Sequence, residues 1–236
     1  MNYRKLFLPA LAMTLLSASS CSTHCISGDG TIQSENRNVA TFTGVASNGS
    51  FDVFLTQDTV QSVRIEADEN LLHNIKTEVT DNKLKISTDK CFSTNHTVKV
   101  YVSARQITDI DLKGTGTVTA DKTLVGADLE VEIKGSGDIK LPVNMQSVKV
   151  SIKGTGSIWL KGATTNLEAD IMGTGDIKAE SLDTKDCKAT IKGNGNITVN
   201  PTGNLEATIK GSGDIYYMGA PNVKTEISGS GKVLKK

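Results

Sequence analysis

The chain has 236 residues, and its 26 Lys and Arg residues balance 26 Asp and Glu residues, so its formal net charge is zero. This balance, together with the lack of a basic cluster in the sequence, argues against nucleic acid as a partner. Aromatic residues make up only 4% of the chain, which argues against an extended sugar-stacking groove.

Residues 1–20 have the layout of a secretory signal peptide. Arg4 and Lys5 precede a mostly apolar run, and small residues come directly before Cys21. The apolar run is shorter than the roughly 20 residues that a membrane-spanning helix needs. We therefore expect residues 1–20 to be cleaved after export.

Cys21 is the expected site of lipid attachment. Residues 16–21 resemble a bacterial lipobox, with Ala18 where that motif usually has leucine. Acyl chains on Cys21, at the start of a 21–36 linker, would hold the protein at a membrane. We expect this lipid to anchor the protein in the cell envelope, at the outer membrane, on either its periplasmic or its surface face. Ordinary cleavage, which would leave a soluble secreted protein, is the alternative.

Three further cysteines follow, and an exported protein can form disulfides. Because three is an odd number, at least one thiol must stay free. Cys25 and Cys91 can either bridge or remain reduced. Cys187 shares a column of apolar repeat positions and is predicted to be a small buried hydrophobic residue.

Residues 37–109 alternate between apolar and polar side chains, which predicts β-strands. The clearest runs are 51–55, 63–67, 84–86 and 98–102. Asp81 and Asn82 predict a turn, and residues 69–75 predict one helical turn. We expect these strands to form irregular first coils or a small sheet that caps one end of a longer repeat.

Residues 110–236 repeat a Gly-x-Gly signature at intervals of 18 to 21 residues. Every second residue around each signature is apolar, as at Ile209 and Ile215, which is the period of a half-buried strand and excludes an amphipathic helix. A repeat of about 20 residues without helical periodicity predicts a right-handed parallel β-helix with one repeat per turn. An antiparallel barrel or sandwich is the rival fold, but strands of alternating direction have no reason to keep one motif in phase.

The paired glycines are predicted to form the same tight corner in each turn. They are Gly114, Gly116, Gly135, Gly137, Gly154, Gly156, Gly173, Gly175, Gly193, Gly195, Gly211, Gly213, Gly229 and Gly231. Glycine suits such a corner because it allows positive φ and close backbone packing. A dinucleotide-binding role is disfavoured because a third glycine and a following helix are missing. The acidic position after the glycines is often replaced, so we expect no calcium ladder, no other metal and no cofactor.

The N-terminal strands and the later repeats together resemble a known family. Residues 43–57, 63–72 and 84–86, followed by the Gly-Ser/Thr-Gly-Asp-Ile motifs, are similar to the head GIN domain family, also called putative auto-transporter adhesins. The resemblance covers residues 37–233, within an expected domain of residues 37–236. It implies a β-helical exported protein of Gram-negative envelopes, often a lipoprotein, and it supplies no catalytic residues.

One outward column of the repeats is the candidate contact surface. Strand alternation places Lys140, Trp159, Lys178 and Tyr216 in that column, where an exposed indole could contact a glycan or an envelope protein. Packing of Trp159 beneath a loop is the alternative. The other outward columns carry Lys, Ser, Thr and Asp, and we interpret them as a solvated stripe.

These observations favour a non-catalytic binding or adhesion module. A β-helical polysaccharide-active enzyme is one alternative, and it would need a cleft in which carboxylates and a basic residue converge. A purely structural component of the envelope is the other alternative.

Overall fold

The computed structural model describes residues 25–236, so the expected signal peptide and Cys21 lie outside the described residues. The protein is nearly all β, with 63% strand and 3% helix. The elements are β1 (Ile26–Ser27), β2 (Ile32–Arg37), β3 (Gly44–Ser47), β4 (Phe51–Gln57), β5 (Ser62–Asp68), the 3₁₀ helix η1 (Glu69–Asn74), β6 (Ile75–Thr80), β7 (Lys83–Thr88), β8 (Phe92–Ser93), β9 (Val98–Ala104), β10 (Asp109–Leu112), β11 (Thr117–Ala120), β12 (Leu124–Ile133), β13 (Asp138–Ile152), β14 (Ile158–Ile171), β15 (Ile177–Ile191), β16 (Ile197–Ile209), β17 (Ile215–Tyr217), β18 (Asn222–Ile227) and β19 (Val233–Lys235).

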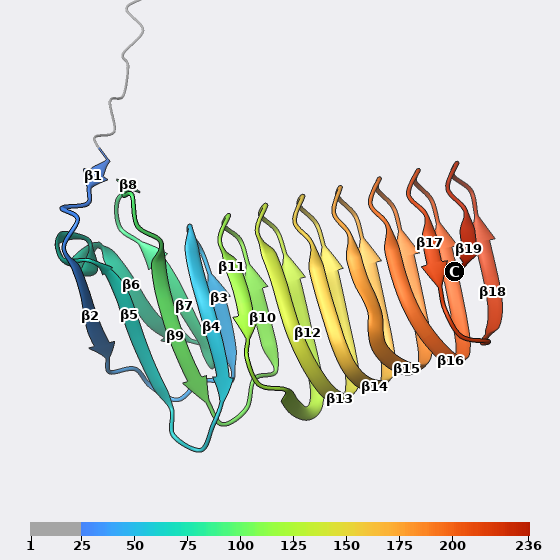
Figure 1. Ribbon diagram of the computed structural model, residues 1–236, viewed down its shortest axis with the longest axis horizontal. Coiled ribbons are helices and arrows are strands. Elements are labelled where there is room, and N and C mark those ends of the chain that lie inside the picture. Colours follow the sequence, from blue (N-terminus) through green and yellow to red (C-terminus); the bar gives the residue numbers. More distant parts are fainter. Residues whose placement is uncertain (1–24) are drawn as a thin grey trace, which may run out of the picture.

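The repeats wind into a parallel β-solenoid of about seven turns, which confirms the expected fold class and excludes the antiparallel rival. Each turn has one strand segment before the glycine corner and one after it, so the rod has two faces (Figure 1). The apolar alternation around each signature forms two ladders of inward residues, and both are paired in register. They are Ile133, Ile152, Ile171, Ile191, Ile209 and Ile227 before the corner, and Ile139, Ile158, Ile177, Ile197, Ile215 and Val233 after it. Identical side chains stacked in this way form one continuous core.

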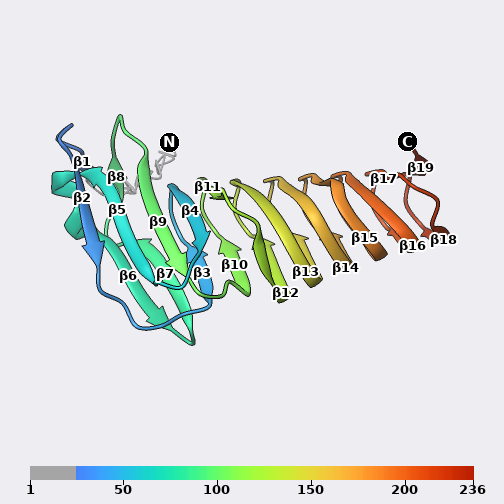
Figure 2. The same cartoon turned by 60° about the horizontal axis from the view of Figure 1, so that its bottom comes forward.

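The N-terminal region contains both irregular first coils and a small capping sheet, the two alternatives that the sequence allowed. β3 and β4 form a regular coil that pairs in parallel with β10 and β11. β7 and β9 pair in parallel on the other side of that coil, so the order of coils along the rod differs from their order in the chain. β2, β5 and β6 add antiparallel strands that close this end of the rod (Figures 1 and 2).

The glycine corners stack directly on one another, and of the two reasons expected for glycine only close backbone packing applies. Among the described glycines only Gly30, Gly162 and Gly219 have positive φ, so the expectation of positive φ at the corners is wrong. Each corner glycine instead lies against the carbonyl oxygen of the corresponding residue in the neighbouring coil. A Cβ atom added to Gly175, for example, would lie 1.8 Å from the carbonyl oxygen of Gly156. The corners therefore need glycine because a Cβ atom there would collide with the backbone of the neighbouring coil, about 4.8 Å away.

The cysteines are divided between a bridge and the core. Cys25 and Cys91 form a disulfide, and the short parallel strands β1 and β8 pair beside it. Cys187 is free and only 5% exposed, as its apolar column predicted, and burial raises the pKa of its thiol to about 12. Cys187 is therefore an unreactive core residue at neutral pH.

A candidate binding face on the solenoid

The four candidate contact residues lie in one outward column of the strands that follow the glycine corner. Lys140 pairs with Trp159, and Trp159 pairs with Lys178 in the next coil. Thr198 then separates Lys178 from Tyr216. The strand alternation in the sequence was therefore sufficient to identify a real column of neighbouring side chains.

This column continues into the N-terminal region, which the sequence did not indicate. Thr119 pairs with both Lys140 and Phe54, and Phe54 in turn pairs with Tyr101. The rings of Phe54 and Tyr101 stack with their centroids 5.1 Å apart, and Arg64 lies opposite Tyr101. We call the whole set the aromatic-cationic column, and it consists of Arg64, Tyr101, Phe54, Thr119, Lys140, Trp159, Lys178, Thr198, Tyr216 and Leu234.

Cations lie over the rings of this column. The ammonium groups of Lys140 and Lys178 are each 4.9 Å from the centroid of Trp159, one from each neighbouring coil. The guanidinium of Arg64 is 4.1 Å from the ring of Tyr101. Trp159 is half-buried, with one lysine from each neighbouring coil over its ring. These contacts favour the observed placement of the cations, since cation–π contacts at exposed sites contribute about 0.5–1 kcal/mol each.

A hollow of about 420 Å³ opens at the centre of the column. Lys140, Lys161 and Lys178 line it together with Trp159, and Glu180 is the one acidic residue in its wall. None of these three lysines forms an ion pair within residues 25–236. The pocket therefore has excess positive charge that the protein itself does not neutralise.

A second hollow, of about 340 Å³, lies along the same column at the N-terminal side. The stacked rings of Phe54 and Tyr101 line it, together with Asp58 and Asp121. Because Asp121 directly follows the strand that carries Thr119 and Ala120, which line the larger hollow, the two hollows are neighbours on one face.

The opposite face of the rod neutralises its own charge. Its outward column alternates strictly in sign from coil to coil, in the order Glu130, Lys149, Glu168, Lys188, Glu206 and Lys224. Three pairs within it are ion pairs, with N–O distances of 3.4 to 3.5 Å. The sequence contains this alternation at the repeat period. Glu168 and Glu206 border a hollow on this face, but each is paired with a lysine of the following coil, so the arrangement favours cross-coil stabilisation over catalysis.

Glu132 on this face gives a test by pH. Its partial burial raises the pKa, but hydrogen bonds and charges from Lys134 and Lys153 outweigh burial and hold the pKa below its ordinary value. This pairing stabilises the fold above the unfolded-state pKa of about 4.3, and the contribution is lost as the pH falls through the lower folded-state pKa. We expect the thermal midpoint of Glu132→Gln to fall less steeply on acidification from about pH 5 to pH 2 than that of wild type. The exposed Glu78→Gln variant is the control and should keep the wild-type slope, whereas equal slopes in all three proteins would contradict the assignment.

The acidic positions after the glycines have a structural role. The Oδ1 atoms of Asp138, Asp176, Asn196 and Asp214 each accept a hydrogen bond from the backbone N–H at the same position of the next coil, at 2.7 to 3.1 Å. Asp52 accepts the corresponding bond from Thr117. These side chains therefore join successive corners. Within residues 25–236 no group of three or more His, Cys, Asp or Glu side chains has the spacing of a metal site.

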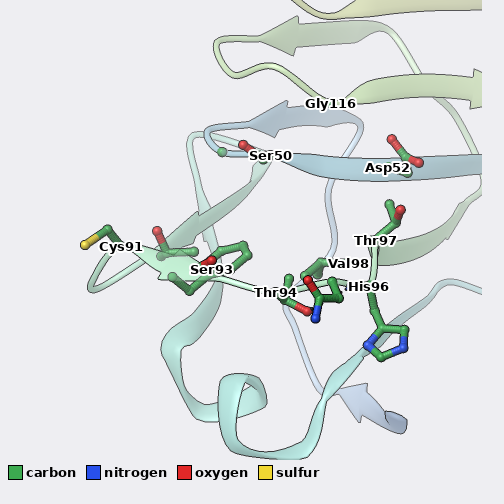
Figure 3. Close-up of a pocket in the computed structure, with 13 residues that line it drawn as sticks. Ser50, Asp52, Cys91, Ser93, Thr94, His96, Thr97, Val98 and Gly116 are labelled. Carbon is green, nitrogen blue, oxygen red and sulfur yellow. Dashed lines mark hydrogen bonds between the residues drawn. The ribbon is translucent and has the colours of Figure 1, made fainter. Parts of the chain in front are cut away.

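A polar pocket of about 640 Å³ lies at the capped end, beside the disulfide (Figure 3). Ser50, Asp52 and His96 line it, but they do not form a catalytic triad. Ser50 bonds to Thr115, and the imidazole of His96 points away from Asp52, with its Nδ1 atom 3.7 Å from Asp68. The geometry that nucleophilic catalysis needs, a nucleophile bonded to an oriented base, does not occur among these residues.

The comparisons with known proteins agree with this architecture. A family model described as "Putative auto-transporter adhesin, head GIN domain" matches residues 41–221. A putative adhesin from Bacteroides fragilis NCTC 9343 is 25% identical, with a TM-score of 0.85 over 89% of this chain and 100% of its own. A putative adhesin from Parabacteroides distasonis ATCC 8503 is also 25% identical, with a TM-score of 0.70 over 90% of this chain and 100% of its own. A putative lipid binding protein from the same organism, at 22% identity and a TM-score of 0.71 over 90% of this chain and 100% of its own, shows the fold alone. No curated protein matches the chain.

Proposed function

Because the chain belongs to the putative auto-transporter adhesin, head GIN domain family, we propose that it is a non-catalytic binding module of the cell envelope that holds an acidic glycan along its aromatic-cationic column. The family supports an envelope or surface location, and within the described residues no helix is long and apolar enough to cross a membrane. The finer location, a lipid on Cys21 at the outer membrane, is part of the same proposal.

The charge of the central hollow supports an anionic ligand. Lys140 and Lys178 approach Trp159 from the two neighbouring coils, so their ammonium groups are placed before a ligand arrives. Pre-ordered cations lose little side-chain entropy on binding. Carboxylate or sulfate groups of a polymer could be bound by these lysines and by Lys161, which also lines the hollow.

The spacing of the rings supports a linear ligand that runs along the rod. Phe54, Trp159 and Tyr216 recur at every third strand of the column. Three strand spacings correspond to about 14 Å, so the rings divide the face into two equal intervals. A chain of sugar rings can place apolar C–H groups against such rings and acidic groups against the lysines between them.

A glycan suits this face better than a peptide strand does. The hollow is on the middle strands β13, β14 and β15, whose backbone groups are already paired with neighbours on both sides. Recognition of an extended peptide by strand addition needs an unpaired sheet edge. The side chains alone must therefore provide the contacts, as they do when a polymer is bound by its rings and charges.

Calorimetric titration of the mature protein with oligogalacturonate and with heparin oligosaccharides tests the proposal, because these probes carry carboxylates and sulfates respectively. We expect binding to at least one of them, with Trp159→Ala weakening it by about 30-fold, since truncation of a buried anchor commonly costs 2 kcal/mol or more. Tyr216→Ala should weaken binding of longer oligosaccharides, which can reach from one ring to the next.

Two controls separate the column from general charge attraction. Lys192→Ala removes an exposed lysine beside a glycine corner, outside the hollow, and should leave affinity unchanged, whereas Lys178→Ala should reduce it. Methyl-esterified oligogalacturonate lacks the negative charge and should bind more weakly than the free acid. Undiminished affinity in both Trp159→Ala and Tyr216→Ala, or no binding of either acidic probe, would contradict the proposal.

A further inference from the structure

Among residues 25–236, no further coil covers the C-terminal end of the rod. Within this part of the chain β18 pairs only with β16 and β19 only with β17, so both strands have an unpaired edge there. Val223 and Ile227 are 39% and 47% exposed, although their column neighbours Leu205 and Ile209 are almost completely buried. All six residues of β18 are exposed. The final coil thus presents core side chains and a free strand edge at the same place.

The N-terminal end of the rod is closed by its own strands, so it differs from the C-terminal end. At the N-terminal end, the antiparallel strands β2, β5 and β6 and the helix η1 close the solenoid, and Leu71 and Leu72 of η1 are buried there. Head-to-tail stacking would have to place the open end against these closing strands. A contact between two open ends is a closed, two-fold arrangement and does not extend into a fibre.

The sequence of β18 is complementary to itself when it is reversed. Thr225 is the centre of this symmetry. Val223 and Ile227 lie two residues before and after it and point inward. Lys224 and Glu226 lie one residue before and after it and point outward. In an antiparallel pair centred on Thr225, Val223 would therefore face Ile227 of the second copy. Lys224 would face Glu226 twice, once on each side of the axis, and opposite charges directly across an antiparallel pair stabilise it.

From this complementarity we propose that the protein forms a dimer through its C-terminal coil, with β18 of two copies paired antiparallel about Thr225. The pairing joins two solenoids into one longer rod and continues the column of Val223 and Ile227 across the interface. It also gives a partner to Lys224, whose side chain is 83% exposed and contacts Glu206 only at 3.5 Å. This inference is independent of the ligand on the aromatic-cationic column.

The charges provide the first test. Sedimentation equilibrium of residues 25–236 should give a dimer for wild type, and Glu226→Lys should shift the dissociation constant upward by at least about 10-fold, because it places two lysines opposite each other on both sides of the axis. The double variant Lys224→Glu/Glu226→Lys exchanges the two charges and should restore dimerisation. Circular dichroism confirms that each variant is folded, since both positions are exposed.

A cysteine on the axis provides the second test, which defines the register. Position 225 would lie opposite itself, so Thr225→Cys should form a disulfide-linked dimer on mild oxidation. Asn222→Cys, which would lie opposite residue 228 of the second copy, should cross-link far less. A monomeric wild type at high protein concentration would overturn the proposal and identify Lys232, Lys235 and Lys236 as charges that protect the open edge from pairing. Equal cross-linking of the two cysteine variants would overturn the proposed register.

Discussion

Replacement of Gly175 by valine is expected to destabilise the domain by more than about 3 kcal/mol, because the stacked corners have no space for a side chain. A Cβ atom at Gly175 would lie 1.8 Å from the carbonyl oxygen of Gly156 and 3.1 Å from Cγ2 of Ile152. The first of these contacts is with backbone, so it can be relieved only by separating two coils and their hydrogen bonds. Chemical denaturation monitored by circular dichroism measures the free energy of unfolding.

Alanine variants test whether the clash of the first side-chain carbon with the neighbouring coil, and not the size of the valine side chain, causes the loss of stability. Gly175→Ala should already lose most of the stability that valine loses, because the first carbon atom makes the clash. Gly126→Ala is the matched control, since its Cβ atom would meet only the side chain of Met145, at 3.3 Å. We expect that variant to remain within about 1 kcal/mol of wild type. If the two alanine variants had similar stability, close stacking of coils would not be the reason for the glycines.

Removal of the Cys25–Cys91 disulfide is expected to have the other large effect. The bridge joins residues 66 positions apart, and closing a loop of that length restricts the unfolded chain by about 4 kcal/mol. It also joins the chain beside β1 to the chain beside β8. Cys91 itself lines the polar pocket near the closed end (Figure 3). The double variant Cys25→Ser/Cys91→Ser should therefore unfold at a clearly lower denaturant concentration than wild type.

Reducing agent distinguishes the bridge from the substitutions themselves. Dithiothreitol should destabilise wild type to about the level of the double variant and leave the double variant unchanged. Cys187→Ala tests the buried free thiol. It should lower the free energy of unfolding by about 1 kcal/mol, and this loss should be the same with and without reductant. A wild-type protein whose stability is unaffected by reductant would show that the bridge does not contribute as proposed.

The strands at the closed end also supply part of the aromatic-cationic column. Phe54, Tyr101 and Arg64 come from β4, β9 and β5, which are separated in the chain but adjacent in the sheet. Their contact extends the aromatic-cationic column beyond the repeats.

The regular half of this protein could be predicted from the sequence alone. Alternation within a strand and a period of 18 to 21 residues are local properties, and together they predicted the parallel coils, both isoleucine ladders and the burial of Cys187. The same alternation placed Lys140, Trp159 and Lys178 side by side. Once each repeat forms one turn, equivalent positions must stack.

The features that depend on which coils are neighbours could not be predicted from the sequence. The chain returns to place β7 and β9 outside β3 and β4, and this insertion brings Tyr101 beside Phe54. It also brings Cys91 to Cys25, a pairing that the sequence left open. The need for glycine at the corners likewise arises between coils, from a backbone contact with the next turn, and not from the φ of the glycine itself. Such contacts have no local signature because both partners acquire them only when the coils stack.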